Sequence, residues 1–168
     1  GNFSASFWIK TPDLSAALLT LGNNISSPYE GYLSGINAGF VGSGKLGVST
    51  GGGVWTGSIN TISDNDWHNI TYVLNNNTLK IYLDNVLDIQ TTVNNIPISW
   101  SGNRVIGCTN DLLLIPERLY NGIIDDIGIW NRALTQEEVT ALYNASYACA
   151  PQIKKGLSYS DKPLRLTK

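Results

Sequence analysis

Two adjacent carboxylates, Asp125 and Asp126, lie in the middle of the apolar run GIIDDIGIW, residues 122–130. The run is typical of a β-strand, in which successive side chains point to opposite faces. Simple alternation predicts that Asp125 shares a face with Ile123, Ile127 and Ile129, whereas Asp126 points the other way. A carboxylate on an apolar face is costly unless something compensates its charge. The pattern therefore predicts that some group compensates Asp125, and backbone amides at the rim of the sheet are one candidate.

Few other side chains could carry out catalysis. His68 is the only histidine, and it follows Trp67 at the start of an expected strand without a nucleophile motif, so we interpret it as structural. A retaining glycoside hydrolase needs two carboxylates about 5 Å apart across the sugar. The glutamates, at positions 30, 117, 137 and 138, do not provide such a pair. The sequence therefore predicts a protein that is not an enzyme.

Sugar binding requires exposed aromatic faces together with amide and hydroxyl groups on loops. The candidate residues are Trp55 in GGGVWTG, Tyr29 and Tyr32 in SPYEGY, and Trp100 in ISWSGN. Glycines around Trp55 would let its ring stand out of a loop and stack on a pyranose. The alternative is that Trp55 fills one end of a hydrophobic core, as buried tryptophans commonly do.

The two cysteines, Cys108 and Cys149, belong to no CxxC motif or Cys/His cluster, which argues against zinc. They are interpreted either as two free buried thiols or as a disulfide between an internal strand and the chain after the last helix. We predict the disulfide, because the composition is typical of an extracellular protein. It would close a loop of about 40 residues and contribute about 3–4 kcal/mol.

Length and composition limit the possible classes of function. The chain has 168 residues, 17 glycines, 14% charged residues and a net charge of −2. This balance gives no electrostatic basis for binding nucleic acid or an anionic membrane. No apolar run approaches the roughly 18 residues of a membrane span, so no membrane insertion is expected. One β-rich extracellular domain is the prediction.

The elements that must position these residues are mostly strands. Residues 3–9, FSASFWI, alternate with apolar side chains at every second position, and residues 68–85 form the clearest hairpin, with NNN at its turn. Glycine-rich turns divide residues 31–57 into further short strands. Many short strands with this punctuation predict an all-β, two-sheet antiparallel jelly-roll sandwich.

One short helix is predicted at residues 136–144. Thr135 and Glu138 can form a capping box, and Leu134 and Val139 the hydrophobic staple beside it. The domain is expected to span residues 1–149. Residues 150–168 have a different character, with five Lys or Arg and one acid, and are predicted to be a basic tail or linker. An extended arm that docks on a neighbour is the alternative.

A family resemblance is carried by DNDWHNITYVLNNNTLKIYLDNVL (64–87) and YNGIIDDIGIWNRALTQEEVTALYN (120–144). These segments resemble the laminin-G-like, concanavalin-A-like lectin/glucanase superfamily, in the variant common in secreted bacterial surface proteins. The resemblance spans roughly residues 1–147 and implies the jelly roll. Family members usually begin with another strand ahead of the one matched by FSASFWIK, and nothing precedes Gly1 here. We therefore expect an exposed edge strand that could pair with another strand.

The resemblance also implies a function. The matching Asp of the family often ligates a structural calcium, so Ca²⁺ held by Asp125 and Asp126 is the predicted cofactor, consistent with the oxygen ligands that Ca²⁺ prefers. The predicted function is a non-catalytic extracellular module that binds a glycan or cell-surface ligand, as a lectin or in cell adhesion. The alternative is a structural or assembly domain that makes protein contacts, with self-association through an unpaired edge strand or the C-terminal tail.

Overall fold

The computed structural model describes residues 2–12, 17–21, 36–40, 45–49, 55–62, 64–93, 104–107, 109–110, 116–117 and 119–149. Within these ranges the chain forms twelve strands followed by a single helix. The elements are β1 (Phe3–Lys10), β2 (Ala17–Leu21), β3 (Ile36–Phe40), β4 (Lys45–Ser49), β5 (Trp55–Thr61), β6 (His68–Asn75), β7 (Thr78–Leu83), β8 (Val86–Thr92), β9 (Arg104–Ile106), β10 (Thr109–Asn110), β11 (Pro116–Glu117), β12 (Ile123–Trp130) and α1 (Gln136–Cys149).

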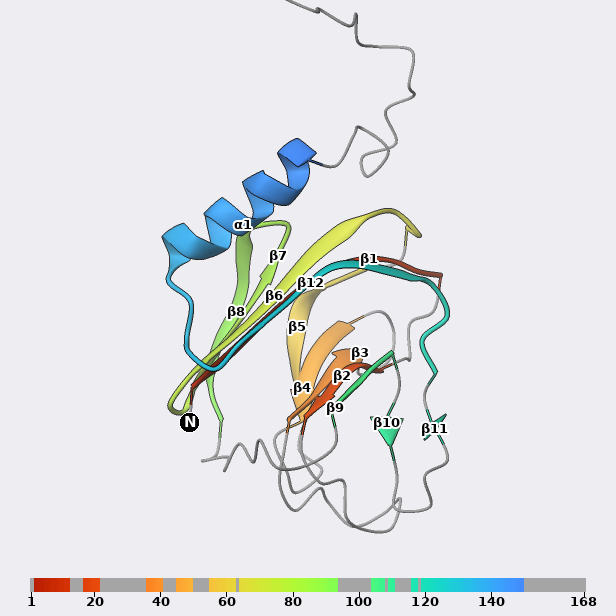
Figure 1. Cartoon of the computed structure of the whole chain (residues 1–168). Helices are drawn as coiled ribbons and strands as arrows, with labels where there is room; N and C mark the ends of the chain where they lie inside the picture. The colour runs from red at the N-terminus through yellow and green to blue at the C-terminus, as the bar shows by residue number, and fades with distance from the viewer. Residues whose placement is uncertain are drawn as a thin grey trace, which may run out of the picture.

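The strands form two layers. Sheet A has the order β12-β1-β6-β7-β8, sheet B has the order β5-β4-β3-β2-β9, and β10 pairs with β11 in a small third sheet. The paired strands run antiparallel in each case. Figure 1 shows α1 on one side of sheet A and sheet B on the other. The predicted antiparallel two-sheet sandwich with one helix is confirmed.

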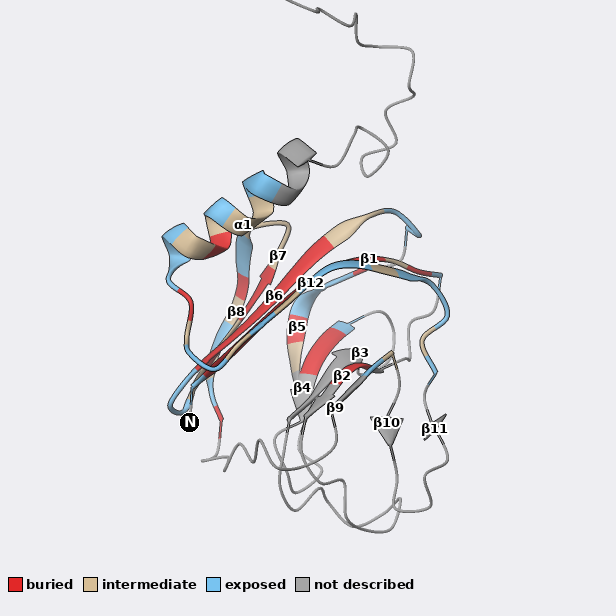
Figure 2. Ribbon diagram, viewed as in Figure 1, coloured by how far each residue is buried: buried red, intermediate tan, exposed pale blue. Residues whose placement is uncertain are grey.

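The main core lies between the sheets and follows the alternation of β1. Its fully or almost fully buried members on β1, β6 and β7 are Phe3, Ala5, Phe7, Ile9, Ile70, Tyr72, Leu74, Leu79 and Ile81. The band of buried residues along the middle of sheet A is visible in Figure 2. Burying such side chains contributes about 1.5–3 kcal/mol each, which is why the central strands of this sheet carry the regular alternation seen in the sequence.

Two tight turns join the central strands. Asn75 pairs with Thr78 across the β6–β7 turn, and Asn76 between them has a φ of 52°. The β7–β8 turn has two left-handed residues, Asp84 and Asn85, with φ of 49° and 67°. Asn and Asp tolerate this region better than other non-glycine residues, and two-residue hairpins require it. The hairpin predicted for residues 68–85 is confirmed.

A second apolar cluster fixes α1 on the outer face of sheet A. It contains Val73 and Tyr82 from the sheet, and Leu134 and Val139 from the predicted staple. The capping box also forms, because the Thr135 amide donates to Glu138 Oε2 at 2.9 Å and the Glu138 amide to Thr135 Oγ1 at 3.3 Å. These contacts explain why the helix begins where the sequence predicts.

The predicted end of the helix was wrong. Asn144 was expected to terminate it, but α1 continues to Cys149. The indole of Trp8 and the ring of Tyr143 stack with centroids 5.5 Å apart and planes 21° from parallel. This packing, formed by residues distant in sequence, holds the helix on the sheet near Asn144 and outweighs the modest intrinsic preference of asparagine for helix ends.

Candidate ligand-binding site

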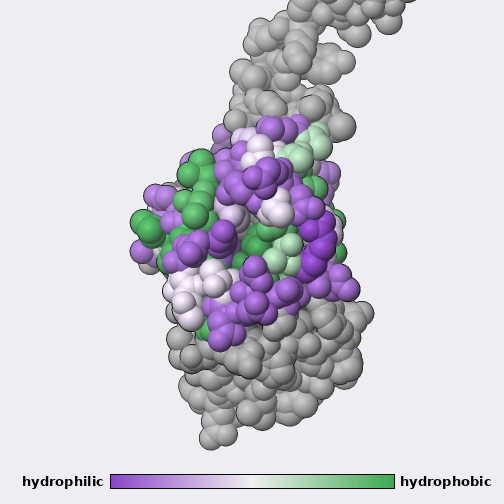
Figure 3. All heavy atoms as spheres, turned by 90° about the vertical axis from the view of Figure 1, so that its left-hand side faces the viewer, coloured by the Kyte–Doolittle hydropathy of each residue, from purple (hydrophilic) through white to green (hydrophobic). Residues whose placement is uncertain are grey.

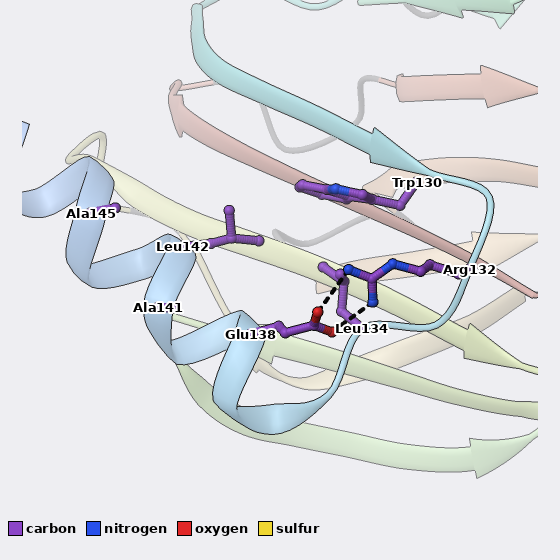
Figure 4. A pocket seen from close by; sticks show the side chains of 7 residues that line it. All are labelled: Trp130, Arg132, Leu134, Glu138, Ala141, Leu142 and Ala145. Carbon is purple, nitrogen blue, oxygen red and sulfur yellow. Dashed lines mark hydrogen bonds and ion pairs between the residues drawn. The ribbon is translucent and has the colours of Figure 1, made fainter.

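A pocket of about 320 Å³ opens between α1 and the end of β12. We call it the α1 pocket, and Figure 4 shows its lining side chains. They are Trp130, Arg132, Leu134, Glu138, Ala141, Leu142 and Ala145. The sheet contributes the indole, the connection between β12 and α1 contributes Arg132 and Leu134, and the helix contributes the remaining side chains.

Gly128 determines how the Trp130 indole lies. A β-carbon added at Gly128 would overlap the six-membered ring of Trp130, so the indole folds back over its own strand. Gly128 and Trp130 pair with Ser6 and Ser4 of β1, which places all four residues on the outer face of sheet A. The indole therefore forms a flat wall of the pocket, facing the helix (Figure 4).

The connection that leads to the pocket is fixed by one serine. Ser4 Oγ donates to the carbonyl of Arg132 at 2.9 Å and accepts from the amide of Leu134 at 3.0 Å. Ser4 is fully buried. Because both backbone groups are satisfied by the same hydroxyl, β1 sets the path of the chain between β12 and α1.

An ion pair borders the pocket. Arg132 donates from Nη1 to Glu138 Oε2 and from Nη2 to Glu138 Oε1, both at 2.7 Å. The Arg132 hydrogen bonds, followed by the Thr135 amide, lower the pKa of Glu138 to about 2. The same carboxylate raises the pKa of Arg132. The pair is therefore charged throughout the ordinary pH range, and it presents a planar, bidentate array at the surface.

The α1 pocket combines an aromatic wall, aliphatic helix residues and charged hydrogen-bonding groups. Small-molecule sites in proteins are usually concave and largely apolar, with a few polar groups that fix the orientation of the ligand. A sugar ring likewise has an apolar C–H face, which could contact the apolar walls, and hydroxyls at its edge, which could contact the polar groups. The surface around α1 is otherwise mostly hydrophilic, with apolar atoms in separate groups (Figure 3).

Most of the aromatic residues predicted to bind sugar lie outside the described residues. This applies to Tyr29, Tyr32 and Trp100, whereas Trp55 begins β5 with its backbone described and its side chain not. Cys108 also lies outside the described residues, and Cys149 is described only as the last residue of α1. The sugar-binding roles and the Cys108–Cys149 disulfide stay predictions. The disulfide would lower the mass of the native chain by two hydrogens.

The prediction for the face of Asp125 was wrong. The register of β12 with β1 shifts between Gly128, which faces Ser6, and Asp125, which faces Trp8, so two residues of β12 oppose Phe7 alone. Asp126 adopts a φ of 49° at this bulge. The extra residue moves Asp125 to the outer face of sheet A, away from Ile127 and Ile129, while Ile123 stays on the same face as Asp125.

The carboxylates are also exposed, and β12 is an edge strand rather than a buried one. Asp125 Oδ1 accepts a hydrogen bond from the Asp126 amide at 2.9 Å. Calcium takes six to eight oxygen ligands. Among the described residues, no group of three or more His, Cys, Asp or Glu side chains is placed to hold a metal. The described part of the chain does not by itself assemble a calcium site, and ligation by Asp125 and Asp126 stays a prediction.

His68 has a more specific role than the sequence indicated. Its Nδ1 lies 2.8 Å from Asp84 Oδ2 and its Nε2 lies 3.0 Å from Asp64 Oδ1. Asp84 also accepts from the Asn69 amide at 2.9 Å. The hydrogen bond with Asp84, aided by Asp64, raises the pKa of His68 to about 9. A protonated His68 therefore joins the start of β6 to the β7–β8 turn.

The α1 pocket itself was missed from the sequence. Glu138 was explained by the capping box, and its second role became visible only once Arg132 lay beside it. The spacing of six residues between Arg132 and Glu138 is not a helical repeat, because the helix begins between them. A glycine two residues before a tryptophan, as in Gly128 and Trp130, is the one local signal that the indole could fold back.

The arrangement of sheets and helix defines a lectin-like β-sandwich. Residues 1–140 match the family described as the concanavalin A-like lectin/glucanases superfamily, Laminin_G_3. The chain belongs to this family. No curated protein matches the chain. In the described part of the chain, no helix is long and apolar enough to cross a lipid bilayer.

Solved structures share the fold. Domain 4 of AbnA, a GH43 extracellular arabinanase from Geobacillus stearothermophilus solved with arabinotriose, is 23% identical, with a TM-score of 0.61 over 84% of this chain and 66% of that one. The sialidase CBM40 of Ruminococcus gnavus, bound to α2,3 sialyllactose, is 14% identical with a TM-score of 0.68, covering 84% and 82%. A heptameric pentraxin from Limulus polyphemus is 16% identical with a TM-score of 0.63, covering 84% and 69%. The chain spans 39% of a putative carbohydrate binding protein from Bacteroides ovatus.

Proposed function

We propose that this chain is a non-catalytic extracellular module that binds carbohydrate or mediates adhesion, and that the α1 pocket receives a sugar ring. The observation that carries the proposal is the Trp130 indole beside the Arg132–Glu138 pair in a cavity of about 320 Å³. The apolar face of a sugar would stack on the indole, and its hydroxyls would bond the outer edges of the ion pair. Such aromatic and arginine groups commonly dominate binding energies.

The comparisons support the class of ligand. The arabinanase domain is described with arabinotriose and the CBM40 with sialyllactose, on the same fold. Because a shared fold does not establish a shared function, the proposal depends on the pocket rather than on the similarity. Trp55, Tyr29, Tyr32 and Trp100 provide the competing location that the sequence predicts.

A glycan array with calcium present, followed by calorimetry with the best ligand, tests the proposal. Ala145 lines the pocket and is exposed, so Ala145→Gln should fill the cavity without disturbing the core. Asn144→Gln is the matched control, since Asn144 is exposed on the same turn and does not line the pocket. We expect Ala145→Gln to weaken binding by about tenfold or more, equivalent to about 1.4 kcal/mol, and Asn144→Gln to leave it unchanged.

Other outcomes are equally informative. Binding that survives Ala145→Gln and is lost in Trp55→Ala would overturn the pocket and favour the aromatic residues predicted from the sequence. An array without hits would overturn the carbohydrate proposal. It would favour the second candidate function, a structural domain that makes protein contacts. That alternative is supported by the exposed isoleucines of β12.

A further inference from the structure

One edge of sheet A exposes several large apolar side chains. Among the described strands, β1 is the only partner of β12, so no described strand pairs with its other side. Ile123, Ile127 and Ile129 on this strand are 55%, 43% and 39% exposed. An edge strand with exposed apolar side chains is a template for pairing with another strand. We call Ile123–Trp130 the β12 edge.

The bulge gives the β12 edge two chemically different faces. Ile129 lies opposite Ala5, a core residue of β1, so Ile129 and Ile127 are on the face that looks toward sheet B. Asp125 lies opposite Trp8 on the outer face. Ile123, which lies opposite Lys10, is on this outer face too. A strand added here would need apolar side chains toward the core, and a positive charge on the outer face would complement Asp125.

The last segment of the chain has this pattern. Residues 150–168 carry five of the 11 Lys and Arg and one of the 13 Asp and Glu, so their net charge is +4 and that of residues 1–149 is −6. In PLRLTK, residues 163–168, Leu164 and Leu166 alternate with Arg165. In a strand the two leucines would share one face, and Arg165 would point to the other. Both the charge and the alternation complement the β12 edge.

The segment also starts close to the edge. Tyr143 of α1 stacks on Trp8, the residue that faces Asp125 across the β1–β12 pair. Cys149 ends the helix six residues later, which is about 9 Å along its axis. The residues that follow could span about 45 Å before reaching Leu164 if extended. Covalent attachment at this distance gives a millimolar effective concentration, which a free partner rarely reaches.

We propose that residues 164–168 of this chain pair with the β12 edge as an additional strand of sheet A. Leu164 and Leu166 cover Ile127 and Ile129, and Arg165 lies opposite Gly128 on the outer face, diagonally across from Asp125. Pro163 is tolerated at the start of the new strand because its missing N–H lies at the sheet boundary.

A second copy of the chain fits this edge less well. Pairing of two β12 strands about a two-fold axis would bring Asp125 and Asp126 of both copies near the axis. Like charges opposite one another destabilise a strand pair. The basic segment of the same chain removes this repulsion and replaces it with attraction.

Hydrogen–deuterium exchange on the 168-residue chain tests the proposal. We expect the Leu164→Asp/Leu166→Asp variant to speed exchange of the β12 amides by about tenfold or more, because the added strand no longer protects them. Exchange in β8, the opposite edge of sheet A, should not change. Leu157→Asp, in the same segment but outside the proposed strand, is the matched control and should behave as the wild type.

A carbodiimide cross-link provides independent evidence of the register. It should join Asp125 or Asp126 to Lys162 or Lys168 within a monomer and fail in the double variant. Equal β12 exchange in the wild type and in the double variant would overturn the proposal. Protection that appears only as protein concentration rises, with cross-links between chains, would overturn it in favour of a second copy.

Discussion

The two edges of sheet A are built differently. At the β8 edge, Asp88 is buried and joins sheet A to sheet B across the sandwich. Its carboxylate accepts from the Ile59 amide at 2.7 Å, the Asn60 amide at 3.1 Å and Asn60 Nδ2 at 2.5 Å. At the β12 edge the carboxylates are exposed, and the isoleucines also reach solvent.

The difference shows what an acid does at each edge. The Asp88 side chain satisfies donors of another sheet, so β8 is tied to the sandwich near its middle, and its exposed apolar residues Val86 and Leu87 lie at the turn. Asp125 instead bonds the amide next to it, within its own strand. A buried acid therefore ties one edge of sheet A to sheet B. At the other edge, the acid bonds within its own strand beside a bulge, and this edge stays available for a partner.

Replacing Asp88, whose carboxylate joins the two sheets, should have the largest effect on stability. We expect Asp88→Ala to lower the free energy of unfolding by about 3 kcal/mol, since it removes three hydrogen bonds to a buried carboxylate. Urea denaturation measures this change. Asp126→Asn at the other edge is the control and should change stability by less than about 0.5 kcal/mol. Equal effects at the two edges would contradict the comparison.

Close packing around Gly122 fixes the chain where it enters β12. A β-carbon there would overlap the Lys10 carbonyl oxygen and lie 2.8 Å from Thr11 Cβ and 2.9 Å from Tyr120 Cε1. We expect Gly122→Ala to cost about 2 kcal/mol, because a backbone atom cannot move aside as a flexible side chain would. Thermal unfolding measures the loss. Gly122→Ala with wild-type stability would show that the chain entering β12 adjusts freely.

Sequence patterns predicted the parts of the fold in which one face is buried. The alternation of residues 3–9 and 68–83 located β1, β6 and β7, because their apolar side chains fill the core. Alternation failed at β12, where a bulge at Asp126 changes the face of every residue beyond it. Nothing in GIIDDIGIW marks the bulge, since its cause is the pairing with β1.

The candidate site was less predictable for a related reason. The α1 pocket needs Trp130 from a strand and Ala141 and Ala145 from a helix that ran past its predicted end. Likewise, the Asp88 carboxylate bonds residues that lie 28 and 29 positions before it and belong to the other sheet. Sequence periodicity reports which residues share a face of one element, and it contains no information about which elements meet.

The stability of the protein should also depend on pH, through His68 at the start of β6. In the folded protein the pKa of His68 is about 9, above its ordinary value of 6.5, because Asp84 and Asp64 stabilise the charged ring. A raised folded-state pKa contributes stability that is complete below about pH 6.5 and is lost as the pH rises through about 9. Because the aspartates are partly exposed, we expect a loss of about 1 kcal/mol at most. Urea denaturation of wild type and His68→Gln across this window measures it, and a wild-type slope retained in His68→Gln would refute the assignment.

The smallest expected effect concerns the two carboxylates of the β12 edge. If Ca²⁺ binds the native chain through Asp125, free Ca²⁺ at its dissociation constant should stabilise the protein by about 0.4 kcal/mol, and chelator should remove this gain. Asp126→Asn should keep the response, since asparagine tolerates the left-handed backbone at this bulge, whereas Asp125→Asn should lose it. Melting temperatures with and without Ca²⁺ measure the difference between the two variants. A melting temperature insensitive to Ca²⁺ in the wild type would mean that Ca²⁺ is not a partner of either carboxylate.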